Sequence, residues 1–281
     1  MTRLLPHEWL FGAYILITWL RLLAAGKVLG TDSLVYLGCL ITAACLAVWG
    51  QRRDTSVAWR WRLLFYPLAM NLLFQQMRTA IPAFQPARFD HLLRTIDGLL
   101  LPDSPSFLLE PYVATWATDV LSLCYLLFFP YLLFSLIYYF TDELHLLKAF
   151  VVGLFSLYGL GFLGYTLVPA AGPYLAFARD FHMPFAGGVL TQWNAALVGM
   201  GSTGVDVLPS LRVGVSGFLL GFDFRHKRWR FWLYLVPCAG LWFSTLYLRY
   251  HYLIDLLCGV VLALLALGIA ERHYNQERTS P

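Results

Sequence analysis

The residues with the clearest chemical potential lie in the segment STLYLRYHYLID, residues 244–255. His251 and Asp255 are four residues apart, so on one helix they share a face. The carboxylate would then hold one imidazole nitrogen as N–H and leave the other nitrogen free to act as a nucleophile. Arg249 carries a guanidinium whose planar shape suits phosphate oxygens. The segment therefore predicts a nucleophilic histidine beside an anion-binding arginine.

Two further segments carry helix-end signals. In VLPSLR, residues 207–212, Pro209 and Ser210 suit a first helical turn, whose backbone N–H groups are a ready site for an anion. The same pair also occurs as an ordinary helix cap. In GFLGYTLVPAAGP, residues 161–173, glycines permit close helix approach and prolines end the helix. Alone, each segment is compatible with a plain helix terminus.

The elements that position these residues are predicted to be transmembrane helices. Of the 281 residues, 59% are hydrophobic and 13% are charged, and the mean hydropathy is +0.64. Soluble domains carry about 25% charged residues, so a soluble enzyme is excluded. The net charge of +4 is spread over short basic clusters, which argues against a nucleic-acid partner. The five cysteines form no CxxC pair and lie mostly in apolar runs, so neither a metal site nor a disulfide is predicted.

Uncharged stretches define the spans. Residues 33–51, 120–141, 149–178 and 231–248 contain no charged side chain, and each is long enough to cross roughly 30 Å of hydrocarbon as a helix. Shorter apolar runs bring the total to about eight, which makes the fold an all-α polytopic helix bundle. The predicted spans are 9–26, 34–50, 62–82, 112–140, 147–168, 208–223, 230–247 and 251–270. The third requires partners inside the bundle for Asn71, Gln75 and Gln76.

The distribution of basic residues predicts the orientation. With both termini cytoplasmic, twelve of the 20 Lys and Arg residues, including the RHKRWR run, fall on the inner side, as the positive-inside rule expects. A cleaved signal peptide at the N-terminus is the alternative. In this topology the three chemistry-bearing segments meet at the outer face. Their charged residues then form either an intramembrane site or an interfacial cluster that snorkels to lipid headgroups. His7, His145, His226 and His273 fall on the inner side and are predicted to lie at the surface or the membrane interface.

Two long connections, 83–111 and 169–207, are also placed outside. The first contains FDHLLRTIDGLL, in which apolar residues at helical spacing lie opposite Asp90, Arg94 and Asp97. This pattern predicts a helix in the membrane interface or a lid packed on the bundle. The second connection is rich in Pro and Gly and is predicted to be irregular.

Together the segments resemble the type-2 phosphatidic acid phosphatase superfamily, and within it the branch of inositol phosphorylceramide synthases and their bacterial relatives. The similarity runs from about residue 85 to 270, through DHLLRTID, GYTLVPAAGP, LPSLR and STLYLRYHYLID. It implies a six-helix core in which a histidine takes a phosphoryl group from a lipid and passes it to water or an alcohol, without a metal or other cofactor. It also implies N-terminal helices at 1–84, a catalytic membrane domain at 85–270 and a cytoplasmic tail at 271–281.

The resemblance assigns roles to individual residues. His251 matches the nucleophile and Asp255 its orienting partner. Three residues match phosphate-binding positions: Ser210, Ser244 and Arg249. The superfamily has an arginine directly after the third motif's serine, where this chain has Thr245. An arginine two positions before the histidine is typical of the synthase-like branch. Five residues are candidates for lining the pocket: Asp119, Tyr125, Tyr165, Tyr174 and His182. Asp119 equally suits a structural cap.

One position departs from the family. The central motif reads Pro-Ser-x-His there, and its histidine protonates the leaving group, whereas this chain has Arg212. Arginine stays charged up to about pH 12, so it can stabilise phosphate oxygens but cannot act as the acid. Three explanations compete: an altered or engineered variant, an enzyme with another acid such as His182 or Tyr174, or a lipid-phosphate-binding protein without catalysis.

The sequence thus predicts a membrane lipid phosphatase or phosphotransferase that moves a phosphoryl or phospho-headgroup unit, inositol phosphate among the candidates. Its partners would be a membrane phospholipid or sphingolipid and an alcohol or polyol acceptor. The alternatives are the non-catalytic binder and, third, a transporter whose path is lined by the polar residues of span 62–82. The short loops favour a bacterial inner membrane with a periplasmic site, and a Golgi-type membrane with a lumenal site, which has the same topology, is the alternative. The sequence makes no prediction of oligomeric state.

Overall fold

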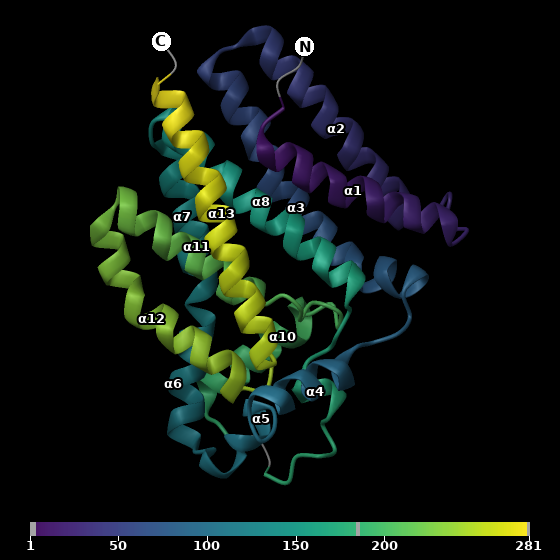
Figure 1. Cartoon of the computed structure of the whole chain (residues 1–281), viewed down its shortest axis with the longest axis vertical. Helices are drawn as coiled ribbons and strands as arrows, with labels where there is room; N and C mark the ends of the chain where they lie inside the picture. Colours follow the sequence, from purple (N-terminus) through teal and green to yellow (C-terminus); the bar gives the residue numbers. More distant parts are fainter. Residues whose placement is uncertain (1–3, 184–185, 280–281) are drawn as a thin grey trace. The chain divides into compact units, whose positions relative to one another are not determined.

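The computed structural model describes residues 4–183 and 186–279, and every regular element among them is a helix (Figure 1). The helices are α1 (Pro6–Ala24), α2 (Thr31–Arg53), α3 (Ser56–Phe84), α4 (Asp90–Leu100), α5 (Pro105–Leu108), a 3₁₀ turn η1 (Glu110–Tyr112), α6 (Thr115–Leu126), α7 (Phe128–Thr141), α8 (Leu144–Leu167), α9 (Pro173–Ala176), α10 (Val189–Gly201), α11 (Leu211–His226), α12 (Arg228–Tyr247) and α13 (Leu253–Thr279). The all-α prediction is confirmed.

Each predicted span coincides with a helix or, for 112–140, with the pair α6 and α7. Among the described residues, four stretches are long and apolar enough to cross a membrane: Thr31–Arg53, Thr115–Thr141, Leu144–Leu167 and Leu253–Thr279. The total of eight spans stays a prediction. Helix α13 continues to Thr279, so most of the segment predicted as a tail is helical.

The chain divides into two compact units. Unit 1 comprises residues 1–87, 136–167 and 264–281, and unit 2 comprises residues 88–135 and 168–263. The division near residue 87 lies close to the predicted boundary at 84. In the structure, however, α8 and the end of α13 group with the N-terminal helices. The three motif segments fall in unit 2, apart from residues 161–167 at the end of α8.

Aromatic packing dominates unit 1, where α1 packs against α2 and α8. Gly159 makes this approach possible, because a Cβ there would lie 2.8 Å from the backbone of Phe11. Next to this core, His7 is fully buried and its ring meets that of Tyr66 edge to face at 4.4 Å. The prediction of a surface position for His7 is therefore wrong, because α1 already begins at Pro6 and turns its first residues inward.

The expectation that polar residues of α3 have partners inside the bundle is also wrong for Asn71 and Gln75. Asn71 does not have a partner inside the bundle: it is exposed and donates to the carbonyl of Pro67 in its own helix at 3.0 Å. Gln75 is exposed as well. Asn71 and Gln75 therefore face outward within unit 1, whereas Gln76 is half-buried.

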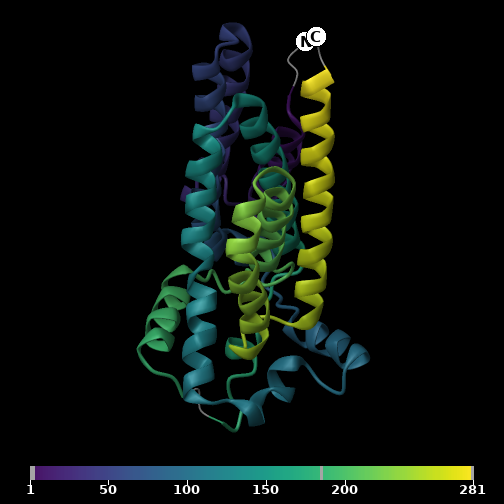
Figure 2. The ribbon, with the colours of Figure 1, turned by 90° about the vertical axis from the view of Figure 1, so that its left-hand side faces the viewer.

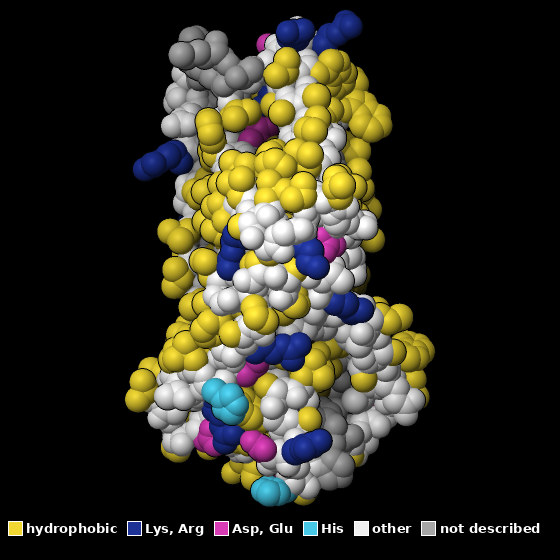
Figure 3. All heavy atoms as spheres, turned by 90° about the vertical axis from the view of Figure 1, so that its right-hand side faces the viewer, with side chains coloured by type: hydrophobic (Ala, Val, Ile, Leu, Met, Phe, Trp, Pro, Cys, Tyr) yellow, Lys and Arg dark blue, Asp and Glu magenta, His cyan; other side chains and the backbone are white. Residues whose placement is uncertain are grey.

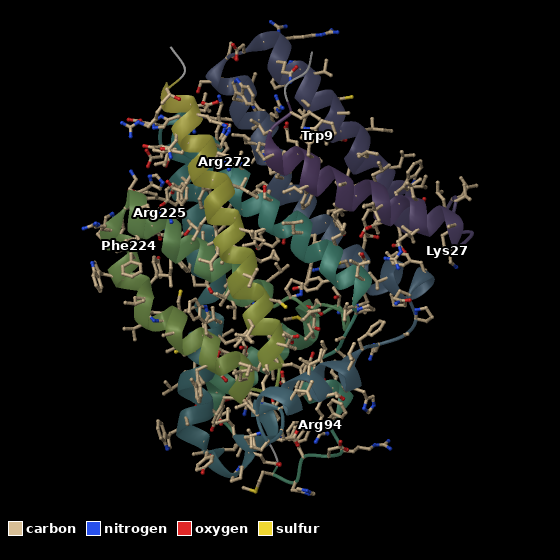
Figure 4. The ribbon with its side chains drawn as sticks, in the orientation of Figure 1. Trp9, Lys27, Arg94, Phe224, Arg225 and Arg272 are labelled. Carbon is tan, nitrogen blue, oxygen red and sulfur yellow. The ribbon has the colours of Figure 1, made fainter. Side chains whose placement is uncertain are left out.

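In unit 2, α12 packs against α11 and α6, and α10 packs against α6 (Figures 1 and 2). The turn from α11 to α12 carries the basic run, with Arg225 extending from the end of α11 (Figure 4). At this turn Arg230 pairs with Asp223 at 2.9 Å, and both side chains are fully buried. Large apolar side chains such as Trp232 and Val236 stay exposed on α12, and hydrophobic side chains cover much of the face shown in Figure 3.

Helix α4 is amphipathic, and its acidic side is the buried one. Asp90 is 4% exposed and Asp97 is fully buried, whereas Leu99 is 80% exposed. Arg94, which extends from α4 in Figure 4, pairs with Asp103 at 2.9 Å. The predicted helix is confirmed, and its two carboxylates point into unit 2. A small apolar core lies beside them, formed by Leu93, Ala170, Phe177, Val207 and Tyr252.

Candidate active site

The site is built around the connection between α12 and α13, residues 248–252, which carries His251. The backbone N–H groups of Tyr250 and His251 both donate to the carbonyl of Thr245, at 3.0 and 3.1 Å. Arg249 has a φ of 64°, in the left-handed region that side chains other than glycine rarely adopt. Such a conformation persists only where the surroundings impose it, so the loop is tightly held.

His251 and Asp255 form the predicted pair, but not on one helix face. Helix α13 begins at Leu253, so His251 precedes it and the carboxylate reaches back from the first turn. The His251 Nδ1 atom lies 3.4 Å from Asp255 Oδ2, and Oδ2 accepts the N–H of Tyr252 at 2.8 Å. His251 is 5% exposed and Asp255 is fully buried. Asp255 therefore binds the backbone next to the imidazole and places its carboxylate beside Nδ1, which has no hydrogen-bond partner among the described residues.

The VLPSLR segment meets this loop at the start of α11. The N–H of Ser210 donates to the backbone carbonyl of Asp255 at 3.0 Å. Gly259 makes the approach possible, because a Cβ there would lie 2.5 Å from the carbonyl oxygen of Ser210. The hydroxyl of Ser210 is fully buried and has no hydrogen-bond partner among the described residues. A buried hydroxyl at a helix N-terminus is thus available to an anion.

Arg212, in the first turn of α11, lies against aromatic rings. Its guanidinium carbon is 4.2 Å from the centre of the Tyr125 ring, 5.0 Å from Phe129 and 5.3 Å from Phe128. Arginine favours such ring faces. The packing restricts the guanidinium to one side of the helix start, where its charge acts on His251.

Three tyrosines form a continuous group beside Arg212. The ring of Tyr250 lies 4.9 Å from that of Tyr125 and 5.1 Å from that of Tyr174. The amide of Asn194 donates to the Tyr250 hydroxyl at 3.1 Å. The N–H of Tyr174 donates to the carbonyl of Arg249 at 2.8 Å. Tyr125 and Tyr174, both predicted to line the pocket, are therefore brought together next to the histidine loop.

Sequence reasoning missed the role of Asp90. Its carboxylate accepts the N–H groups of Ala171 and Gly172 at 2.9 to 3.1 Å and the hydroxyl of Tyr252 at 3.0 Å. Gly172 has a φ of 87°, and a Cβ there would lie 2.3 Å from the carbonyl oxygen of Tyr250. Asp90 thus joins α4, the GYTLVPAAGP segment and the histidine loop.

Asp97 was missed as well. It accepts the N–H groups of Leu253 and Ile254 at 2.9 and 3.0 Å, and the hydroxyl of Ser104 at 2.7 Å. A signal was present in the sequence, because Asp90 and Asp97 are seven residues apart and so share a helix face. Both also lie in a segment that carried the family resemblance.

Arg249 is engaged away from the imidazole. Its Nη2 donates to the carbonyl of Met183 at 3.1 Å and lies 3.6 Å from the Glu110 carboxylate. Its guanidinium also covers the ring of Phe181 at 3.9 Å. The contacts tie the histidine loop to the long connection between α8 and α10.

The remaining predicted residues lie elsewhere. Asp119 accepts the N–H groups of Gly188 and Thr191, at 2.8 and 3.0 Å, and so caps α10. Ser244 donates its hydroxyl to the carbonyl of Leu241 in its own helix at 2.7 Å. His182 is exposed. Tyr165 is buried in α8, which belongs to unit 1.

Burial sets the protonation of the histidine. Removal from water, together with the charge of Arg212, lowers the pKa of His251 to about 3, while the backbone of Val207 acts in the opposite direction. The imidazole is therefore neutral at physiological pH, as a nucleophile must be. Burial also raises the pKa of the Tyr174 phenol, which stays protonated.

Comparison with known proteins identifies the family of this chain. A model of the PAP2 superfamily matches residues 106–269, which is more than half of the chain. The chain belongs to the PAP2 superfamily. No curated protein and no solved structure matches it. Membership of PAP2 indicates a phosphatase-type or phosphotransferase-type enzyme that acts on lipid phosphates, and the four long apolar helices indicate an integral membrane protein.

The PAP2 match covers most of the residues that the structure brings together. Ser210, Arg212, Tyr174, His251 and Asp255 all lie inside it. Helix α4, with Asp90 and Asp97, ends before the match begins. The part of the site inside the match carries the candidate reactive groups, whereas α4 contributes hydrogen bonds to the backbone around them.

Proposed function

We propose that this PAP2 protein transfers a phosphoryl or phospho-headgroup unit from a membrane lipid through a phosphohistidine at His251. One observation carries the proposal: a buried, neutral imidazole lies against Asp255, whose backbone is hydrogen-bonded to the start of α11. A nucleophile, its partner and an anion-binding helix start are thus joined within unit 2.

In the first step the imidazole nitrogen of His251 that does not face Asp255 attacks phosphorus in line. The bond from phosphorus to the leaving oxygen breaks. Asp255 stabilises the imidazolium character that develops. In the second step water or an alcohol attacks phosphorus, the bond from phosphorus to nitrogen breaks, and the neutral imidazole returns. These two reaction steps need one group that first gives a proton to the leaving oxygen and then takes one from the attacking oxygen.

The phosphate oxygens are proposed to bind at the start of α11. The first N–H groups of a helix have no partner within the helix, and the buried hydroxyl of Ser210 adds a donor beside them. Arg212 would supply the positive charge that neutralises the developing negative charge. Ser244, whose hydroxyl is used within α12, is proposed to support the loop instead of contacting phosphate.

For the acid and base we propose Tyr174. It lies against Tyr250 and its backbone is bonded to Arg249, so it is next to the histidine loop. His182, the other candidate, is exposed. The Tyr174 phenol would protonate the leaving oxygen, and the resulting phenolate would accept the proton of the attacking water or alcohol. Because the charge of Arg212 acts against the raised pKa of Tyr174, the same arginine assists this proton transfer.

The finer identity of the reaction follows the family resemblance. Arg249 two positions before the histidine and the GYTLVPAAGP segment favour the synthase-like branch. We therefore propose that a phospho-headgroup, such as inositol phosphate, passes to an alcohol or polyol acceptor on a lipid such as a sphingolipid. We also propose eight spans with cytoplasmic termini, and an outward-facing site in a bacterial inner membrane.

A second candidate function is binding of lipid phosphate without turnover, which is favoured by the arginine at position 212. Replacing Arg212 by His separates the two functions. Gain of phosphate release or headgroup transfer, measured with radiolabelled phosphatidic acid and phosphatidylinositol in detergent micelles, supports the enzyme. Unchanged lipid binding with no activity in either form supports the binder.

The direct test of the proposed enzyme is His251→Ala. We expect this variant to lose headgroup release and transfer from both labelled lipids while it still binds them. Activity equal to that of the unaltered protein would show that His251 is not the nucleophile.

A further inference from the structure

Helix α4 lies outside the residues matched by the family model, yet it is bound to the backbone on both sides of His251. Its two buried carboxylates, Asp90 and Asp97, each accept three donors: one hydroxyl group and two backbone N–H groups. None of these donors is in α4. The carboxylates therefore hold other segments together and do not stabilise their own helix.

Asp97 acts on the residues that follow the histidine. It binds the N–H groups of Leu253 and Ile254, at the first turn of α13, where a helix has no internal partner for them. A carboxylate at this end is also favoured by the helix dipole. Since Asp255 binds the N–H of Tyr252, three successive backbone amides after His251 are held by carboxylates.

Asp90 acts on the other side of the loop. It binds the N–H groups of Ala171 and Gly172 and the hydroxyl of Tyr252. The segment it holds runs along the histidine loop, because the backbone of Gly172 lies against Tyr250 and the N–H of Tyr174 binds the carbonyl of Arg249. Asp90 therefore sets the spacing between the loop and the segment that carries Tyr174.

The two carboxylates of α4 point into the protein, which distinguishes a helix that positions the histidine loop from one that only anchors the chain in the membrane interface. A helix that only lies in the membrane interface keeps its charged face toward water. In α4 the carboxylates are buried and Leu92, Leu99 and Leu100 are exposed. Burying a carboxylate is costly unless hydrogen bonds compensate, and here the donors that compensate come from the loop that carries the nucleophile and from its neighbours.

We propose that Asp90 and Asp97 are positioning residues for His251, which set the imidazole against the start of α11 through the backbone of residues 250–254. The inference rests on the proposed function of His251 and adds a part for α4 that the reaction scheme does not include. Neither carboxylate touches the phosphate in this proposal. Their loss should therefore change the rate of the chemical step more than the binding of phosphate.

Two variants test the proposal. Tyr252→Phe removes only the hydroxyl bound to Asp90, and Asp97→Asn weakens the acceptor for Leu253 and Ile254. The matched control is Asp103→Asn, which makes the same chemical change in a carboxylate that binds the partly exposed Arg94. All are compared with the full chain in detergent, using phosphatidic acid micelles for kcat and KM and inorganic phosphate for the inhibition constant.

We expect kcat to fall about 10-fold in Tyr252→Phe and up to about 100-fold in Asp97→Asn, because small displacements of a reacting group cost rates of this order. KM and the phosphate inhibition constant should stay within about 2-fold. Diethylpyrocarbonate should modify His251 faster in both variants, as read by mass spectrometry, since a loosened loop exposes the imidazole. Asp103→Asn should match the unaltered protein in each measurement.

Unchanged kcat and unchanged modification of His251 in Tyr252→Phe would overturn the proposal, even if Asp97→Asn failed to fold. An equal loss of kcat and of phosphate affinity would also overturn it, because that pattern indicates general unfolding. Failure of the proposed function gives a different result, because His251→Ala then keeps activity. The rate at which diethylpyrocarbonate modifies His251 still reports whether α4 holds the loop.

Discussion

The backbone N–H of Ser210 donates to the backbone carbonyl of Asp255 at 3.0 Å, which joins the start of α11 to the first turn of α13. Through this bond, the helix end proposed to hold phosphate is joined directly to the residue proposed to orient His251. The two motifs are more than forty residues apart in the chain. Their contact explains why a nucleophile and an anion site can keep a fixed separation.

The charge of Arg212 should set the acidic limit of activity. Burial is the main cause of the low His251 pKa, and Arg212 lowers it further because a positive neighbour disfavours the imidazolium. Removing that charge in Arg212→Met should raise the pKa of His251. Since only the neutral imidazole attacks, the acidic limb of kcat/KM against pH should move to higher pH.

Arg212→Lys is the matched control, because it keeps the charge and should leave the limb near its original pH even if the rate falls. A limb at the same pH in Arg212→Met and the unaltered protein would contradict the assignment of this limb to His251.

Ser210→Ala should weaken phosphate binding without destabilising the fold. The hydroxyl has no partner among the described residues, so its loss breaks no bond in the free protein. A hydrogen bond to a charged group contributes about 1.5–3 kcal/mol, which corresponds to roughly a 10-fold or greater rise in the inhibition constant of inorganic phosphate. The measurement pairs that constant with thermal unfolding in detergent.

Ser216→Ala provides the opposite pattern. Its hydroxyl donates to the carbonyl of Arg212 at 2.6 Å and accepts from the indole of Trp242 at 2.7 Å. This variant should lower the unfolding temperature and leave phosphate inhibition unchanged. If Ser210→Ala behaved like Ser216→Ala, Ser210 would be structural.

Gly259→Ala should disturb the junction between α11 and α13. An added Cβ would lie 2.5 Å from the carbonyl oxygen of Ser210 and 3.2 Å from the N–H nitrogen of Gly214. Overpacking of this kind costs about 1–3 kcal/mol, and the shift of α11 should also reduce kcat/KM. Unfolding and kinetics are measured on the same preparation.

Gly199→Ala is the control for the same substitution, because no atom lies within 4 Å of a Cβ there. In the last turn of α10 it should raise stability by up to about 0.5–1 kcal/mol and leave kcat/KM unchanged. Normal activity and stability in Gly259→Ala would show that the two helices do not need this close approach.

Tyr174→Phe should lower kcat by about 10²–10⁴, the range expected for loss of a general acid. The ring and its contact with Tyr250 are kept, so binding of the lipid should change little. His182→Ala, which alters an exposed side chain, should have no such effect. The reverse result would transfer the acid role to His182.

The fold was largely predictable because charge is so scarce in this chain. Every predicted span coincides with helical structure, and His251 and Asp255 form the expected pair. The first turn of α13 was harder to place, since the side chain of Asp97, in α4, binds the N–H groups of Leu253 and Ile254 at its start. A helix start that depends on a carboxylate from another helix leaves no local signal.

Other features of the site were also not predicted, because they depend on contacts between segments that are distant in the sequence. The sequence pattern predicts Asp90 and Asp97 only as the polar side of an interface helix, because their donors are mostly backbone N–H groups, which no residue type marks. The spacing predicts the position of Arg249, but its contacts with Glu110 and Met183 depend on how the two long connections fold. Asp119 was compatible with two roles, and only the position of α10 shows it as a cap.

The most direct measurement of the central claim is to trap the intermediate. Lipid labelled with ³²P in the headgroup phosphate is mixed with the purified protein, quenched in alkali, where phosphohistidine survives, and the labelled peptide is identified by mass spectrometry. We expect label on His251 in the unaltered protein and none in His251→Ala. Turnover without label on His251, or equal turnover by His251→Ala, would contradict it.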